Sequence, residues 1–176
     1  MSQLKVNSIV PVGGLPAGAS AGGIIQTVTA STTTSVSQSY SSEGSFQTTI
    51  TDTGLSASIT PSSNSSKILV MVRQQYAFGY DSDSDLQVHY NFVVRNSSNT
   101  ILHGAIGYGS EGAMRYKSLK AFYQYYTTTF VHSPSTTSSY TYKLGMNAYR
   151  MFGGTTTMYA QLSGNESHIT LMELTG

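Results

Sequence analysis

Apolar and polar residues alternate along much of the chain after residue 23, and this spacing is typical of half-buried β-strands. The clearest case is segment 86–94, where one face carries Leu86, Val88, Tyr90, Phe92 and Val94 and the other carries Gln87, His89 and Asn91. Segment 67–78 begins apolar on both faces, as a strand in the middle of a sandwich does. These two segments are expected to form the centre of the core.

The remaining pattern predicts short strands separated by turns rich in Gly, Ser, Thr and Pro. Segment 51–54, Thr-Asp-Thr-Gly, is expected to be a turn, and segment 31–44 a loop or a weak edge strand. Segment 112–126 has some helical spacing of apolar residues, but it is rich in aromatic residues and runs directly into Thr-Thr-Thr-Phe at 127–130, which favours a strand. Further strands are expected at 24–30, 45–50, 55–60, 101–107, 118–132, 140–150, 156–164 and 167–174.

The pattern therefore predicts an all-β fold of roughly eight to ten strands with no helix, arranged as an antiparallel, jelly-roll-like β-sandwich. Pro11 and Pro16, together with several glycines, rule out a helix in the head of the chain and disfavour a regular strand after Ile9. We expect residues 1–23 to form an extended N-terminal arm and residues 24–176 to form one folded knob.

Composition narrows the functional classes. The 176 residues include no cysteine, which excludes disulfides and thiolate metal sites. Charged residues make up 10% and the net charge is +1, so a phosphate-binding stripe for nucleic acid is not expected. The start of the chain lacks the continuous apolar run of an export signal, and no segment is apolar for long enough to predict a membrane helix. We expect synthesis in a cytosol.

The candidate catalytic and metal-binding patterns are weak. Asp81, Asp83 and Asp85 alternate as in a calcium loop, but Leu86 and Phe92 stand where an EF-hand needs Gly and Glu. A polar hairpin loop is the favoured interpretation, with a bound cation as the alternative. The four histidines lack metal-ligand spacing, and neither a nucleophile elbow nor a phosphate loop is present. The sequence predicts no enzymatic activity and no cofactor.

Tyrosine is the most informative residue type, with 13 in the chain and no tryptophan. A dense aromatic patch is expected to form core and a subunit interface, with a glycan-binding platform as the alternative reading: Phe122, Tyr123, Tyr125 and Tyr126. Loops at the end of the knob far from the arm are candidates for contact with a host surface, through Tyr80, Asp81, Asp83, Asp85, Tyr108, Glu111, Arg150 and Phe152.

Three segments resemble a known family. The opening "MSQLKVNSI" resembles the N-terminus of tail-fibre and tail-associated proteins of marine, cyanophage-like bacteriophages. The segments "GLSASITPSSNSSKILVMV" and "SHITLMEL" resemble the C-terminal β domain of such proteins. The resemblance covers both ends and the first core strands, and residues 80–165 lie outside it.

The resemblance implies a virion structural protein, assembled in the host cytoplasm, with jelly-roll domains in a homotrimer. It also implies that the head is an assembly arm that adds a strand to another virion protein through Leu4, Lys5, Val6, Asn7 and Ile9. The chain has almost no shaft between arm and knob, unlike a long fibre. A capsid decoration protein is therefore the main alternative, and a glycan-cleaving depolymerase is a third reading.

Overall fold

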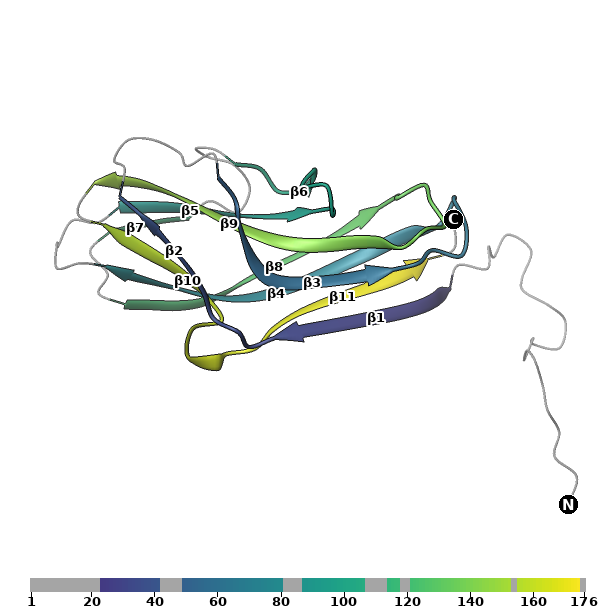
Figure 1. The fold of residues 1–176 in the computed structure, drawn as a ribbon, viewed down its shortest axis with the longest axis horizontal. Coiled ribbons are helices and arrows are strands. Elements are labelled where there is room, and N and C mark those ends of the chain that lie inside the picture. The colour runs from purple at the N-terminus through teal and green to yellow at the C-terminus, as the bar shows by residue number, and fades with distance from the viewer. Residues whose placement is uncertain are drawn as a thin grey trace, which may run out of the picture.

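The computed structural model describes residues 23–41, 49–80, 87–106, 114–117, 121–152 and 155–174. These residues form two antiparallel β-sheets packed face to face, which confirms the predicted sandwich (Figure 1). The described residues contain no α-helix, only one short 3-10 turn, η1 (Leu162–Gly164). Residues 1–22, which include the predicted assembly arm, lie outside the described residues.

The first sheet is built around the long strand β4 (Lys67–Tyr80). One edge of β4 pairs with β8 (Ala121–His132) along nearly its whole length. The other edge pairs end to end with two strands, β11 (Ser167–Leu174) and β10 (Thr156–Ala160). The outer strands β1 (Ile24–Thr32) and β2 (Val36–Tyr40) then pair with β11 and β10 respectively.

The second sheet has β9 (Tyr140–Phe152) and β5 (Gln87–Arg95) in its middle. β3 (Thr51–Ile59) pairs with the outer edge of β9. Two short strands, β6 (Ile101–His103) and β7 (Met114–Lys117), share the outer edge of β5. The register of β5 puts Val88, Tyr90, Phe92 and Val94 inward and buried, as the alternation predicts, and Leu86 lies outside the described residues.

The order of strands within the sheets is that of a jelly roll. Four pairings nest inside one another along the chain: β1 with β11, β3 with β9, β4 with β8, and β5 with β6. The nesting describes one long antiparallel hairpin that has been rolled into two layers. The pairs β1–β11 and β4–β8 lie in the first sheet, and the pairs β3–β9 and β5–β6 in the second.

The prediction of a turn at 51–54 is wrong. These residues belong to β3, which runs without interruption from Thr51 to Ile59. Gly54 has a φ of +80°, and the register against β9 shifts between Asp52 and Ser56. The glycine therefore supplies a bulge inside the strand rather than the reversal that its flanking polar residues suggested.

Gly104 lies where a side chain has no room. Its φ is +81°, and a Cβ added there would lie 2.5 Å from the carbonyl oxygen of Phe92. We expect Gly104→Ala to lower the free energy of unfolding by about 2 kcal/mol or more, because it adds backbone strain and a clash with the neighbouring strand. Urea denaturation measures this effect.

Gly164 provides the matched control for that measurement. Its φ is +73°, but an added Cβ would meet no atom within 4 Å. Gly164→Ala should therefore show only the cost of the left-handed backbone, about 1 kcal/mol. Equal losses at the two positions would contradict the close approach of Gly104 to β5.

Candidate functional site

The sandwich has two distinct ends. At one end, which we call the base, β1 begins and β11 finishes, with Ile24 paired to Leu174 and Leu174 paired to Lys67 (Figure 1). At the opposite end, the distal end, Tyr80 pairs with Thr156. Gln87 pairs there with Phe152 and with Lys117. The chain thus enters the sandwich at the base, and segments 81–86, 118–120 and 153–154 connect strands at the distal end.

The predicted host-contact residues fall into two groups. Asp81, Asp83, Asp85, Tyr108 and Glu111 lie outside the described residues. The other three were predicted in loops and are instead strand residues at or near the distal end: Tyr80, Arg150 and Phe152. β4 and β9 run further than predicted. β10 and β8 pair with the last residues of β4, and β5 pairs with β9 as far as Phe152, the last residue of β9.

The four residues of the predicted subunit interface all lie in β8 but do not share one face. Tyr123 and Tyr125 are 57% and 43% exposed on the outer side of the first sheet. The guanidinium of Arg73 lies 3.7 Å from the centre of the Tyr125 ring. Tyr126 points inward, with its ring stacked 4.7 Å from that of Phe92, and Phe122 stands opposite Phe78 in the strand pairing.

The inner side of β8 is fixed by two histidines. His103 of β6 stacks on Phe130 with ring centres 4.3 Å apart, and its Nε2 is 2.8 Å from the hydroxyl of Thr128. Nδ1 of His132 is 2.9 Å from the Tyr142 hydroxyl, and burial lowers the pKa of His132. These contacts hold the sandwich together. Among the described residues, no group of three or more His, Asp or Glu is placed to hold a metal ion.

Glu173 is a buried carboxylate whose role the sequence did not reveal. Its Oε1 accepts hydrogen bonds from the amide and hydroxyl of Ser62, at 2.7 and 2.5 Å, and from the hydroxyl of Ser66, at 2.6 Å. Its Oε2 accepts one from Gln26 of β1, at 2.5 Å. Burial alone would raise the pKa of Glu173, but these hydrogen bonds outweigh it and lower the pKa to about 2.

A second buried polar cluster fills the gap where β11 and β10 meet along β4. The amide of Gln75 donates to the Ser167 hydroxyl at 2.9 Å, and its carbonyl accepts from the amide of Gln161 at 3.2 Å. The side chain of Gln161 lies 3.1 Å from that of Gln74. These contacts satisfy the backbone of β4 on the edge where the pairing with β11 ends at Arg73 and the pairing with β10 begins at Tyr76, so that neither of these two strands pairs with Gln74 and Gln75.

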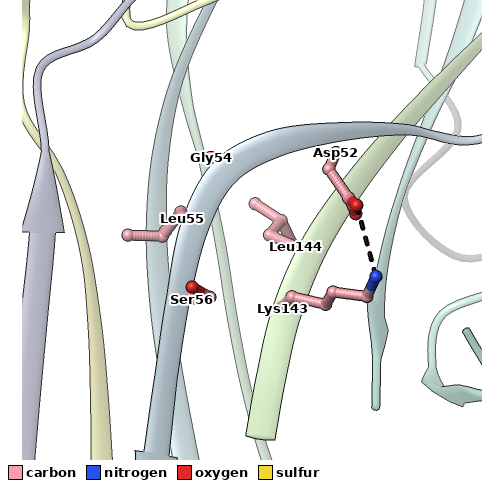
Figure 2. A pocket seen from close by; sticks show the side chains of 6 residues that line it. All are labelled: Asp52, Gly54, Leu55, Ser56, Lys143 and Leu144. Carbon is pink, nitrogen blue, oxygen red and sulfur yellow. Dashed lines mark hydrogen bonds and ion pairs between the residues drawn. The ribbon is translucent and has the colours of Figure 1, made fainter. Parts of the chain in front are cut away.

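A small pocket of about 180 Å³ lies between β3 and β9, lined by Asp52, Gly54, Leu55, Ser56, Lys143 and Leu144 (Figure 2). Lys143 pairs with the Asp52 carboxylate at 3.2 Å, and Arg95 pairs with its other oxygen. Because two cations hold this carboxylate, it is engaged as a structural partner rather than as a free general base. The pocket lies at the bulge of β3, where the register with β9 shifts between Asp52 and Ser56, and Gly54 in this bulge is one of its lining residues.

Within this ion-pair group we expect unequal effects. Arg95 is buried and Asp52 is half exposed, so Asp52→Ala leaves a buried guanidinium without its carboxylate. We expect a loss of about 1–3 kcal/mol in the free energy of unfolding. Lys143→Ala is the control, with an expected loss of less than about 1 kcal/mol. Urea denaturation of both variants at neutral pH tests this, and a larger loss for Lys143→Ala would contradict it.

Comparison with known proteins gives matches in structure alone. No protein-family model and no curated protein matches the sequence. A structure of the Gt strain of infectious bursal disease virus is similar over 86% of this chain and 37% of the viral chain, at 11% identity and a TM-score of 0.48. A VP2 subviral particle of the same virus matches over 86% and 39%, at 9% identity and a TM-score of 0.41. The chain thus spans well under half the length of these viral chains.

The described part of the chain includes no helix with the length and apolar character needed to cross a membrane.

Proposed function

We propose that this chain is a phage virion structural protein of the tail-fibre type, with a structural rather than an enzymatic role. Residues 1–23 attach it to the particle, and the distal end of the sandwich faces the host surface. The observation that carries this proposal is the separation of the two ends. The chain enters the sandwich at Ile24 on the base, whereas segments 81–86 and 153–154 connect strands at the opposite end.

Two of the three segments that carry the family resemblance meet in the structure, which supports the same reading. The first of the three, residues 1–9, lies outside the described residues. The turn that contains Ser62 and Ser66 and the closing strand that contains Glu173 are far apart in the sequence, and the Glu173 carboxylate joins them. Gln26, two residues into β1, binds both Glu173 and the carbonyl of Thr60. The base is therefore reinforced at the point where the arm leaves the sandwich.

The composition of the chain supports contact with a neutral, hydroxyl-rich partner such as a host glycan, although Tyr40, Tyr76, Tyr90 and Tyr142 are buried in the core. The chain carries 13 tyrosines and few charged residues. Tyrosine offers a rigid ring for stacking and a hydroxyl for hydrogen bonding at low cost in conformational entropy. The candidate contact segments 81–86 and 153–154 lie next to strand ends that hold Tyr80 and Phe152.

A capsid decoration protein is the second candidate. One observation favours it: the described residues from Gly23 onward all belong to one sandwich or its connections, with no shaft between arm and sandwich. In that role the same arm would grip the capsid lattice, and the distal end would have no host partner.

Electron microscopy of purified particles labelled with an antibody against the sandwich separates these roles. We expect label at the tail, with the distal loops then worth testing against host glycans. Label spread over the capsid surface would replace the tail-fibre role with the decoration role. Detection of the chain in purified particles by mass spectrometry would support a role as a virion protein. Its absence from purified particles would overturn both roles.

A further inference from the structure

β8 has one free edge. Its pairing with β4 runs from Ala121 opposite Gly79 to His132 opposite Ile68, and no described strand pairs with its other side. In an antiparallel pair, alternate residues point their amide and carbonyl away from the partner. About six of the residues in β8 therefore direct backbone donors and acceptors outward.

This edge lacks the features that normally keep a strand from pairing with another chain. Such features are charged side chains, proline, bulges, short length or a covering segment. The sequence of β8, AFYQYYTTTFVH, has no charged residue and no proline, and its register with β4 is unbroken over 12 residues. It is a long and regular edge along which no other strand of the described residues pairs.

The other outer strands of the described part are protected. β6, β7 and β2 have three, four and five residues. β3 carries a bulge and the charged Asp52. β1 lies alongside β3 and is tied to the chain beyond it by the bond from Gln26 to Thr60 (Figure 1). The contrast makes the edge of β8 unusual within this molecule.

The outer side of β8 carries exposed aromatic and aliphatic side chains, with the exposed Thr127 and Thr129 between them. Tyr123, Tyr125 and Val131 are 57%, 43% and 53% exposed. We call these three side chains, together with the free edge, the β8 surface. The outer side of the second sheet differs, because Val93 is only 1% exposed there and a Cβ on Gly104 would meet it at 3.4 Å. The chain covers that side itself and leaves the β8 surface uncovered.

We propose that the β8 surface is the contact through which a second copy of this chain packs. Contact surfaces between identical chains are rich in aromatic residues and poor in charge, as this one is. β8 itself carries no charged residue, so its edge adds no repulsion between two copies. The guanidinium of Arg73, which lies over the Tyr125 ring, is a cation that the packed face must accommodate. The chain thereby hides apolar area that a lone copy exposes to water.

A second copy also fits the edge by length. Three described strands have twelve or more residues: β4 with 14, β9 with 13 and β8 with 12. β4 and β9 already have strands on both sides, so β8 of another copy is the described strand that can pair along the full edge. Pro11 and Pro16 interrupt the head of the chain, so its sequence offers no regular strand of this length.

Two arrangements satisfy this contact. Two β8 edges that pair antiparallel are related by a two-fold axis and give a dimer with a continuous sheet. A ring of three, as the resemblance implies, sets β8 of each copy against a different part of its neighbour. In a continuous sheet Tyr123 and Val131 gain neighbours across the strand pair, whereas packing of the β8 surface against a neighbouring copy buries them. Neither arrangement depends on which part of the particle the arm holds.

Light scattering on the full chain across a concentration series tests the proposal. We expect a dimer or trimer for the unaltered protein. In Tyr123→Lys/Val131→Lys, two charges on the β8 surface should raise the dissociation constant at least about tenfold. The control Thr27→Lys/Thr29→Lys places the same charges on exposed positions of β1 in the same sheet and should leave the dissociation constant unchanged.

Hydrogen exchange on the same samples completes the test. If the outward-pointing amides of β8 exchange slowly in the assembly, the β8 edges of two copies are paired. If these amides exchange fast although the assembly forms, the copies are packed through the face of β8 instead. A monomeric unaltered chain would overturn the proposal, as would an assembly equally resistant in the charged variant and the control. Slow exchange in a monomer would assign the edge to the chain's own head instead. If the double variant does not fold, Tyr123→Lys alone serves in its place.

Discussion

Phe92→Ala is expected to lower the free energy of unfolding by about 3–5 kcal/mol. Phe92 is fully buried at the centre of the sandwich, and its ring lies 4.7 Å from that of Tyr126 and 5.2 Å from that of Tyr76. Tyr126 comes from the edge strand β8 and Tyr76 from β4, so Phe92 joins the second sheet to two strands of the first. Truncation of Phe92 leaves a cavity between the rings of Tyr126 and Tyr76. These rings belong to two paired strands whose positions are fixed, so they cannot move in to fill it.

Urea denaturation at neutral pH measures this loss, and Ile25→Ala is the control. Ile25 lies on the outer strand β1 and is 47% exposed, so its truncation should cost less than about 1 kcal/mol. Losses of similar size at the two positions would contradict the assignment of inward and outward faces.

Glu173→Ala is expected to lower the free energy of unfolding by about 3 kcal/mol. The change removes one acceptor group and leaves the Ser62 amide, the hydroxyls of Ser62 and Ser66 and the side chain of Gln26 without their partner. Glu166→Ala is the matched control. Glu166 is half exposed and lies 3.3 Å from His168, and its loss should cost less than about 1 kcal/mol.

The same carboxylate should make stability depend on pH. The pKa of Glu173 is about 2 in the folded chain, below the value of about 4.3 expected when unfolded. Between these values the unfolded chain binds more protons, so stability rises with pH there. The contribution of Glu173 is complete above about pH 5 and falls as the pH drops towards 2.

Urea denaturation from pH 7 down to pH 3 measures this dependence. The unaltered chain should lose more stability than Glu173→Ala over that range, so the gap between the two should narrow as the pH falls. A gap of constant width would mean that Glu173 does not hold a lowered pKa in the fold.

Much of the fold could be predicted from local pattern. The alternation in segment 86–94 and the apolar start of segment 67–78 predict β5 and β4 correctly. In a strand, every second side chain points to the same face of the sheet, so burial of one face leaves a visible pattern in the sequence. The expectation for 31–44 included a weak edge strand, and β2 lies there at Val36–Tyr40. The helical alternative for 112–126 is wrong where it is described, because β7 and the start of β8 occupy it.

What the pattern missed depends on partners distant in the sequence. The polar residues around Gly54 predict a turn there, yet β9 pairs with β3 on both sides of this glycine. Glu173 showed no partner in its own segment, since Ser62 and Gln26 lie more than 100 residues away. The buried Gln74, Gln75 and Gln161 likewise have a role only once β10 and β11 meet on β4.

The base of the sandwich also determines how the protein would bear a mechanical load. A particle that pulls on residues 1–23 while the distal end is held draws β1 along its own axis against β11. The hydrogen bonds between antiparallel strands lie across that axis, so they are strained in shear and together rather than peeled one at a time. The side chain of Gln26 adds to this backbone ladder, because it is hydrogen-bonded to Glu173 and to the carbonyl of Thr60 close to Ile24, where the force reaches the sandwich.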